Sequence, residues 1–415
     1  MSRASPPPAV PVAPASSPVA SDASQALSVQ IAREISAAGG WIGFERYMAL
    51  ALYTPGLGYY ARDSRKFGSL PSSGSDFVTA PELGPLFARA LARQLAQALA
   101  ATGTRELWEF GAGSGALAAG LLAELGDAVD RYTIVDLSAT LRERQRATVA
   151  QRAPVQAHKL AFADRWPDAL HGVVVANELL DAMPVLLLAH DGEAWRERGV
   201  ALAPVDEELP GQAPGESDGV PRFVWADRAT DAAPPLDMSD GGSEPLAGCL
   251  TEIGRQGTAF VSSLAERLRR GAVFFIDYGF PESEYYHPQR SGGTLVAHRA
   301  HLVETDPAAL LAEPGDKDLT AHVDFTAIAV AAQDAGLDVL GYTSQARFLF
   351  NCGIADDLAA LQQAGDYAGL AQAHKLVAEH EMGELFKVLG LAVSADDFGA
   401  AGALGFAVGD RSHRL

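Results

Sequence analysis

The stretch ELWEFGAGSG, residues 106–115, decides the fold of this 415-residue chain. A short apolar strand carries an acidic residue, Glu109, near its end, and glycines follow at 111, 113 and 115 before a helical pattern begins. Glycines let the backbone approach a ligand closely, and the first turn of a helix offers free N–H groups. Such a turn can face a dinucleotide, a bound phosphate or S-adenosylmethionine.

Two features of this stretch favour S-adenosylmethionine over a dinucleotide. The glycines follow the spacing G-A-G-S-G, whereas dinucleotide enzymes use GxGxxG. A carboxylate at Glu109 would repel a pyrophosphate but suits the ammonium group of a methionine moiety. Asp136 closes the next strand, 23 residues after Gly113, and a carboxylate there can accept hydrogen bonds from both ribose hydroxyls.

Strand and helix patterns alternate through residues 104–280, which predicts the core of the protein. Runs of Val, Ile and Phe without alternation suit a parallel sheet covered on both faces. The fold class is therefore α/β, with a doubly wound and mainly parallel sheet. The expected strands are 107–110, 131–138, 155–160, 172–181 and 272–279, and the expected helices are 116–125 and 139–151.

Other segments surround or interrupt this core. Residues 1–24 are rich in Pro, Ala and Ser and predict a disordered tail, and residues 25–103 predict a helical section with a cofactor-covering loop. An insertion at 189–250 reads as a hairpin, and residues 281–415 complete the core and add a substrate-side extension. Between Pro204 and Pro245 there are ten acidic and two basic residues, which suit either a solvated, mobile tip or an acidic lip for a basic substrate.

Composition narrows the class of partner. The net charge of −20 argues against nucleic acid or an anionic membrane as the main partner. No apolar run approaches the length of a membrane span, and the N-terminal residues lack the features of a secretory or organelle-targeting peptide. The two cysteines, Cys249 and Cys352, have no metal-binding or disulfide-framework spacing. We therefore expect a cytoplasmic protein with reduced thiols.

The stretch VVVANELLDAMP, residues 173–184, is the second informative region. An apolar strand delivers Asn177 and Glu178 to its carboxyl end, where ligands bind in open α/β sheets. If a helix begins there, Glu178 and Asp181 share a face and are poised to bind a cation. Asn177 is also a good helix N-cap, so simple capping is the alternative interpretation.

Two further stretches contain polar residues that could reach the same edge of the sheet. SDFVTAPELGPLF, residues 75–87, places Asp76 and Glu82 in a loop expected to fold over the glycine turn, although Thr79 and Pro81 also suit helix capping. FFIDYGF, residues 274–280, ends a strand at Asp277. The downstream histidines His298, His301 and His322 suit a polar cleft or structural positions better than a metal site, and no metal is predicted.

Taken together, these stretches resemble the MidA-like S-adenosylmethionine-dependent methyltransferases, a family that includes the mitochondrial complex I assembly arginine methyltransferase. The resemblance extends over residues 41–390, through GFERYMALALYTPGLGYY, SDFVTAPELGPLF, EFGAGSG, VVANELLDAMPV, FFIDYG, GGTLVAHRAH, DLTAHVDF and MGELFKVL. Ser114 stands where many relatives have arginine, and Asp136 replaces a glutamate that is common in the family.

The resemblance implies a class I Rossmann-like methyltransferase core, S-adenosylmethionine as methyl donor, and methylation of an arginine in a protein substrate of the respiratory complex I type. A non-catalytic assembly chaperone and a dinucleotide-dependent oxidoreductase are the alternatives. The oligomeric state is not predicted. The predicted catalytic residues are Glu178, Asp181 and Asp277. The predicted cofactor contacts are Asp76, Thr79, Pro81, Glu82, Glu109, Gly111, Ala112, Gly113, Gly115, Asp136, Leu137, Asn177 and Glu178.

Overall fold

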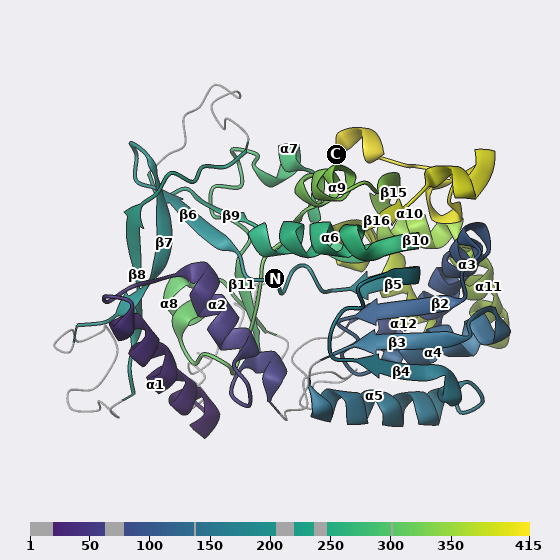
Figure 1. Cartoon of the computed structure of the whole chain (residues 1–415), viewed down its shortest axis with the longest axis horizontal. Coiled ribbons are helices and arrows are strands. Elements are labelled where there is room, and N and C mark those ends of the chain that lie inside the picture. The colour runs from purple at the N-terminus through teal and green to yellow at the C-terminus, as the bar shows by residue number, and fades with distance from the viewer. Residues whose placement is uncertain (1–19, 63–78, 137, 205–219, 236–246, 300–301) are drawn as a thin grey trace, which may run out of the picture.

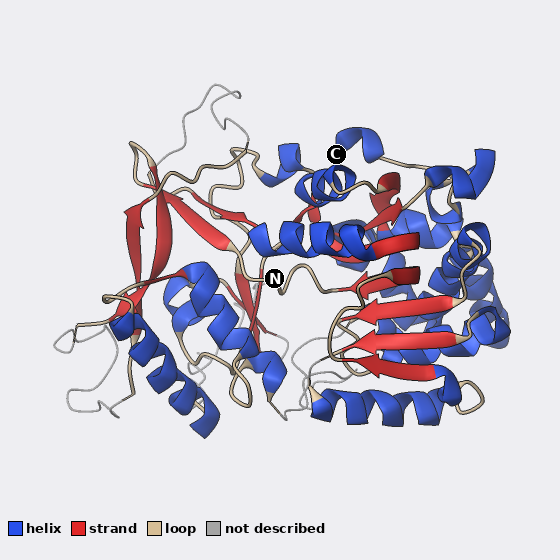
Figure 2. Cartoon of the chain, viewed as in Figure 1, coloured by secondary structure: helices blue, strands red, loops and turns tan. Residues whose placement is uncertain are grey.

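The computed structural model of the chain describes residues 20–62, 79–136, 138–204, 220–235, 247–299 and 302–415. Within these residues, an eight-stranded sheet with helices on both faces forms one side of the molecule. A five-stranded sheet with two N-terminal helices forms the other side (Figure 1). Figure 2 shows the two sheets in red with helices packed around each.

The large sheet is mainly parallel, as the sequence predicts. Its strands are β2 (Glu106–Phe110), β3 (Arg131–Val135), β4 (Leu160–Ala163), β5 (Leu170–Asn177), β10 (Leu268–Phe280), β14 (Val323–Asp324), β15 (Asp338–Ser344) and β16 (Phe386–Ala392). The order from one edge is β4, β3, β2, β5, β10, β16, β15, with β14 pairing with the end of β10. Strands β4 to β10 are parallel, and β16 is antiparallel to both of its neighbours. The carboxyl ends of β2, β3, β5 and β10 therefore share one edge.

Helices bury both faces of this sheet. They include α3 (Pro85–Thr102), α4 (Ala116–Leu125), α5 (Ala139–Arg152), α6 (Arg255–Arg267) and α9 (Phe325–Asp334). On the central strand β5, Val173 and Val175 join one apolar core with α3 and α4. Val174 and Ala176 point to the other face and join a core with α6 and α9. Burial on both faces explains why this strand is a continuous apolar run.

The N-terminal section contains two helices, α1 (Asp22–Ala37) and α2 (Phe44–Tyr53), with Gly39 and Gly40 between them. The predicted tail, residues 1–24, is wrong at its end because α1 begins at Asp22. Ser21 caps this helix by accepting a hydrogen bond from the Ser24 N–H, and its own hydroxyl donates to Asp316 Oδ1 at 2.6 Å. The capping serine was not separable from its Ser-rich surroundings in the sequence. Residues 1–19 lie outside the described part.

The second sheet contains the inserted hairpin. Its strands are β1 (Ile42–Gly43), β6 (Leu186–His190), β7 (Trp195–Leu202), β8 (Phe223–Ala229) and β9 (Leu250–Ile253). Strands β7 and β8 pair antiparallel, and the acidic residues 205–219 between them lie outside the described residues. Leu187 and Val200 of this sheet share an apolar core with Phe44 and Tyr47 of α2. The insertion is thus packed against the N-terminal helices rather than only protruding.

The remaining elements lie around the two sheets, and the three that come last in the chain pack on the face of the large sheet that α3 also covers. In chain order, the remaining elements are α7 (Glu282–Tyr285), β11 (Val296–Arg299), β12 (Leu302–Glu304), α8 (Pro307–Leu311), β13 (Asp318–Thr320), α10 (Gln345–Asn351), α11 (Ile354–Ala364) and α12 (Tyr367–Val377). The strand expected at 155–160 is displaced, because residues 157–159 form a short 3-10 turn. The parallel ladder with β3 begins only at Leu160, opposite Tyr132. None of the described helices is long and apolar enough to cross a membrane.

Candidate active site

Three glycines turn the chain from β2 into α4. Gly111, Gly113 and Gly115 have φ angles of +72°, +49° and +81°, a region that favours glycine. A Cβ atom at Gly115 would lie 2.9 Å from the Gln145 Cα atom of α5, so this glycine permits close packing of the two helices. The turn brings the start of α4, with its free N–H groups, to the carboxyl edge of the sheet.

A cavity of 1160 Å³, called the main cavity below, opens at this edge. The predicted residues that line it are Thr79, Pro81, Glu109, Gly111, Ala112, Gly113, Asp136, Asn177, Glu178 and Asp181. Glu82, Gly115 and Asp277 do not line it. Asp76 and Leu137 lie outside the described residues. Four segments that are distant in sequence, near residues 80, 111, 136 and 178, therefore meet around one space.

Glu109 lies at the floor of the main cavity and is 2% exposed. Burial raises the pKa of its carboxyl to about 8, while a hydrogen bond donated by the Tyr132 hydroxyl to Oε2 at 2.8 Å opposes the shift. A positively charged ligand group beside it would stabilise the carboxylate and lower this pKa. This position suits an amino group of a bound cofactor.

Asp136 is held in one orientation by its neighbours. The Gln145 side-chain N–H donates to Oδ2 at 2.8 Å, and the Ser138 backbone N–H donates to Oδ1 at 2.8 Å. Each carboxylate oxygen has a further lone pair, so both remain able to accept from a ligand. Gln145 is fully buried and its side chain also donates to the Gly113 carbonyl at 3.2 Å, which ties the glycine turn to Asp136.

Glu178 adopts a backbone conformation that is rare outside glycine. No helix begins at this residue, so the condition under which Glu178 and Asp181 would share a helix face is not met; its φ is +52°, at a cost of about 1 kcal/mol or more. The carboxylate accepts from the Asn177 side-chain amide at 2.8 Å and from the Ala80 backbone. Burial raises its pKa to about 8, and nearby Asp181 acts in the same direction. Strain of this kind is characteristic of residues placed for function.

Asp277, predicted as catalytic, shapes this strained turn instead. It is 1% exposed, and its Oδ2 accepts from the N–H groups of Leu179 and Leu180 at 3.1 and 2.9 Å. Its Oδ1 accepts from the Tyr278 N–H at 2.9 Å. Burial raises the pKa of Asp277, with Asp181 and Glu178 adding to the shift. Because both carboxylate oxygens of Asp277 accept hydrogen bonds from backbone N–H groups, Asp277 positions Glu178 and Asp181 and does not line the cavity.

Asp181 lies in the wall of the main cavity, close to Tyr278, Ala321 and the pair of Tyr60 with Asp318. It is 5% exposed, and burial raises its pKa to about 6, with the Tyr278 hydroxyl opposing the shift through a hydrogen bond. Within the described part of the chain, Asp181 Oδ1 has no hydrogen-bond partner. Its backbone carbonyl accepts from the Ala321 N–H at 3.0 Å. Next to it, the Tyr60 hydroxyl donates to Asp318 Oδ2 at 2.7 Å, so the wall is strongly acidic.

The segment 79–83 covers one side of the main cavity. Thr79 precedes a 3-10 turn at Ala80–Leu83 but makes no side-chain cap, so the predicted capping by its hydroxyl is not observed. Glu82 accepts a hydrogen bond from the Ser114 hydroxyl of the glycine turn and lies 3.7 Å from the Arg152 guanidinium. Glu82 therefore anchors the covering segment to the glycine turn and does not line the cavity itself.

Sequence analysis missed several residues of this site. Gln145 and Tyr278 support Asp136 and Asp181, and the wall after β4 adds Asp164 and Trp166. Tyr278 lies in the quoted stretch FFIDYGF but was given no role, and Asp164 and Trp166 follow β4 as observed, Leu160–Ala163, rather than the strand predicted at 155–160. His298 and His322 also line the cavity, whereas His301 lies outside the described residues. Among the described residues, no group of three or more His, Cys, Asp and Glu side chains could hold a metal ion.

These residues fit S-adenosylmethionine. The buried carboxylate of Glu109 suits an amino group, and each oxygen of Asp136 has a lone pair that suits a hydroxyl donor. A profile of the Methyltransf_28 family of S-adenosyl-L-methionine-dependent methyltransferases matches residues 90–343, more than half of the chain. The chain belongs to this methyltransferase family. The resemblance seen in the sequence is therefore confirmed.

Solved structures support the same cofactor. A crystal structure from Burkholderia thailandensis with S-adenosyl-homocysteine bound is 46% identical, covers 96% of this chain and all of that chain, and has a TM-score of 0.86. A native crystal structure from the same organism is also 46% identical over the same shares of both chains, with a TM-score of 0.82. The protein is an S-adenosylmethionine-dependent methyltransferase, and the dinucleotide alternative is set aside.

Curated relatives are more distant. The zebrafish protein arginine methyltransferase NDUFAF7, mitochondrial, is 27% identical over 84% of this chain and 83% of its own. The human protein of the same name is 27% identical over 76% of this chain and 70% of its own length. These relatives are named as mitochondrial proteins, which contradicts the cytoplasmic location predicted from the sequence. The prediction relied on the absence of a targeting pattern, and that absence was not a sound basis for a location.

Proposed function

We propose that this methyltransferase modifies an arginine side chain of a protein substrate. The observation that supports the proposal best is the acidic wall formed by Glu178, Asp181 and Asp318, beside the glycine turn. A guanidinium is a planar cation with five N–H donors, and carboxylates are its natural partners. The names of the distant relatives point to the same substrate group.

In this proposal Asp181 supplies the first negative charge. With a pKa of about 6 it is mainly ionised at neutral pH, and Oδ1 has no partner among the described residues. Glu178, with a pKa of about 8 in the free protein, ionises as the guanidinium arrives, because an opposite charge stabilises the carboxylate. The pair binds and orients the guanidinium and localises its charge away from the reacting nitrogen.

The cofactor supplies the methyl group when it is bound. The residues of this chain do the rest: Glu109 and Asp136 would hold the cofactor, and Glu178 and Asp181 would hold the guanidinium. The reaction releases one proton from the methylated nitrogen, and a carboxylate with a raised pKa is suited to accept it. Asp277 keeps both acidic side chains in place through the turn that it caps.

We further propose that the substrate is a subunit of a respiratory complex I type assembly. The family resemblance and the name shared by the mitochondrial relatives support this choice. An acidic net charge of −20 is compatible with a basic, arginine-bearing partner surface.

The test is methylation of purified complex I subunits with S-adenosylmethionine, read by mass spectrometry of arginine-containing peptides. The wild-type protein should add methyl groups to arginine, and Glu178→Gln should lose this activity while its cofactor binding, measured by calorimetry, persists. Full activity in Glu178→Gln would rule out the proposed acidic pair. Methylation confined to lysine or to a carboxyl group would rule out arginine, and tight binding of a subunit without methylation would favour the chaperone alternative.

A further inference from the structure

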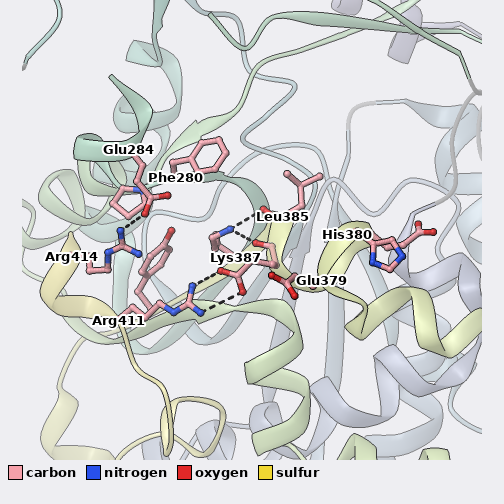
Figure 3. Close-up of a pocket in the computed structure, with 12 residues that line it drawn as sticks. Phe280, Glu284, Glu379, His380, Leu385, Lys387, Arg411 and Arg414 are labelled. Atoms are coloured by element: carbon pink, nitrogen blue, oxygen red, sulfur yellow. Dashed lines mark hydrogen bonds and ion pairs between the residues drawn. The ribbon is translucent and has the colours of Figure 1, made fainter. Parts of the chain in front are cut away.

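A second hollow of 360 Å³, called the Lys387 pocket below, opens next to the main cavity (Figure 3). Its side chains come from the end of β10, from α7, from β15, from the segment 379–385 and the start of β16, and from the C-terminal residues. They are Phe280, Pro281, Glu284, Tyr342, Glu379, His380, Glu381, Glu384, Leu385, Lys387, Arg411 and Arg414. Neither the cofactor site nor the acidic pair uses any of them.

Lys387 is the unusual group of this pocket. It is only 5% exposed, and its ammonium donates to the backbone carbonyls of Glu384 and Leu385. Within the described residues, no carboxylate lies within ion-pair distance of it. Burial lowers the pKa of Lys387 to about 8. The positive charge of Arg411 lowers this pKa further, and the negative charge of Glu384 opposes the shift. An ammonium has three donors, so one remains for a ligand.

Another donor in the pocket, unlike Lys387, makes no hydrogen bond within the described residues. The Tyr342 hydroxyl is buried and has no hydrogen-bond partner in the described part of the chain. Glu284, Glu384 and Arg411 act electrostatically on both Tyr342 and Lys387, so the two groups belong to one cluster. A buried polar group without a partner costs about 1–3 kcal/mol, a cost that a bound acceptor would remove.

The charges of the pocket select a singly charged anion. Arg411 pairs with Glu384, and Arg414 pairs with Glu284, so these four charges cancel. Figure 3 shows the pair of Arg414 with Glu284, and Arg411 near Lys387. Among the described residues that line the pocket, Lys387 is then the one cation outside these pairs, and Arg290 adds positive charge nearby. A single ammonium at the floor matches a carboxylate better than a phosphate dianion.

The lip of the pocket is acidic, because Glu379 and Glu381 are exposed there beside His380. A free dianion would be repelled at this lip. A carboxylate on a peptide chain would reach the floor while backbone N–H groups or basic side chains of the same chain face the lip. The pocket therefore suits part of a polypeptide rather than a small anion.

The pocket is continuous with the proposed substrate site. Leu385 lines both hollows and is 43% exposed, and its neighbour Phe386 lines the main cavity while Lys387 lines the pocket. His322 connects them from the other side, since its ring lies 5.2 Å from the Tyr278 ring of the main cavity and 5.2 Å from the Phe280 ring of the pocket. A chain bound at the acidic wall can thus extend over Leu385.

We propose that the Lys387 pocket binds the carboxylate of an Asp or Glu side chain that flanks the target arginine in the protein substrate. The proposal rests on the proposed arginine methylation. Two sites of opposite charge, side by side, would then define the substrate sequence: an acidic wall for the arginine and a cationic floor for its acidic neighbour.

The first experiment uses peptides with one central arginine, in which each flanking position is in turn Asp, Asn, Lys or Ala. Wild type should methylate peptides with Asp at one spacing with about tenfold higher kcat/KM than the Asn peptides, mainly through KM. Lys387→Met should lose this preference, and Lys387→Glu should favour Lys at the same position. Lys375→Met, which changes an exposed lysine of α12, is the matched control and should keep the wild-type preference.

Calorimetric titration with S-adenosyl-homocysteine checks that each variant is folded and retains its cofactor site. The absence of any acidic preference in wild type, or its persistence in Lys387→Met, would overturn the proposal.

A second experiment does not need methylation, so it separates failure of the pocket from failure of the proposed function. Wild type is titrated with N-acetyl-aspartate methylamide, its asparagine analogue and inorganic phosphate. Binding of the acidic compound in the millimolar range, at least tenfold tighter than the asparagine analogue and abolished in Lys387→Met, is expected. No binding, or tighter binding of phosphate, would overturn the carboxylate assignment even in a protein that methylates arginine.

Discussion

The two ends of the main cavity are built in different ways. The cofactor end comes from one continuous run, β2 through β3, with Glu109, the glycine turn and Asp136 within 28 residues of sequence. The substrate end joins Tyr60, Asp181, Tyr278 and Asp318 from four separate segments. The first end is specified by local backbone geometry, whereas the second exists only after distant elements have packed together. Mutations should therefore separate cofactor binding from methyl transfer.

The largest effect is expected at the glycine turn. Gly113→Val places a β-branched side chain at φ +49°, which is strongly unfavourable and fills the cofactor end. Affinity for S-adenosyl-homocysteine should fall by about 100-fold or more, measured by calorimetry. Gly254→Val is the control, because Gly254 has φ −83° and open space around its Cβ position, and it should bind normally. If Gly113→Val bound S-adenosyl-homocysteine with wild-type affinity, the glycine turn would not be part of the cofactor site.

The next effect should appear at the substrate end alone. Asp181→Asn removes a charge from the acidic wall, so methylation of arginine should slow by roughly 100-fold while cofactor affinity changes by less than about threefold. Single-turnover rates and calorimetry measure the two quantities. Asp397→Asn, at an exposed aspartate, should affect neither. Parallel losses of both quantities would show that the two ends are not separable.

A smaller effect is expected from the residue that links the glycine turn to Asp136. Gln145→Leu removes the donor that lies 2.8 Å from Asp136 Oδ2, and cofactor affinity should fall by about tenfold, since hydrogen bonds to charged groups contribute about 1.5–3 kcal/mol. Gln362→Leu, on the exposed face of α11, is the control. An unchanged affinity in Gln145→Leu would mean that the hydrogen bond from Gln145 is not needed to orient Asp136 for cofactor binding.

The smallest effect concerns pH. Glu109 has a pKa of about 8 in the free protein, and a cationic cofactor stabilises its ionised form, so binding releases a proton. Affinity should rise by about fivefold between pH 7 and pH 8, and fall again at higher pH as the cofactor amino group loses its proton. Tyr132→Phe removes a hydrogen bond that favours the carboxylate, so the midpoint should move to higher pH. Glu109→Gln should make the cofactor affinity nearly independent of pH in this range. Glu178, whose pKa is also about 8, is checked separately, and Glu178→Gln should keep the pH dependence.

The same contrast explains what the sequence could predict. Strand–turn–helix geometry is local, so the glycine turn, α4 and Asp136 follow from periodicity and spacing. Glu178 and Asp181 were also found, because polar residues that follow an apolar strand stand out. Their arrangement was not predicted, since the chain forms a strained turn there and not the helix on which a shared face depended.

That turn depends on Asp277, 96 to 98 residues away in sequence. Spacing along one strand cannot show whether a carboxylate faces a cavity or caps a neighbouring turn. The roles of Gln145, Tyr278 and the Lys387 pocket were not predicted for a similar reason. Each role depends on contacts between elements that are distant in sequence. Long-range packing decides these roles, and no local pattern contains it.

The hydrogen bond from Tyr60 to Asp318, which spans 258 residues, also has a consequence for the order in which the protein matures. At a synthesis rate of roughly 5–20 residues per second, about 13 to 50 seconds separate the emergence of these two residues from the ribosome. The glycine turn and Asp136 emerge early in this interval, and the acidic wall is complete only at its end. A nascent chain thus gains the parts proposed to hold its methyl donor well before the parts proposed to recognise the side chain that is methylated.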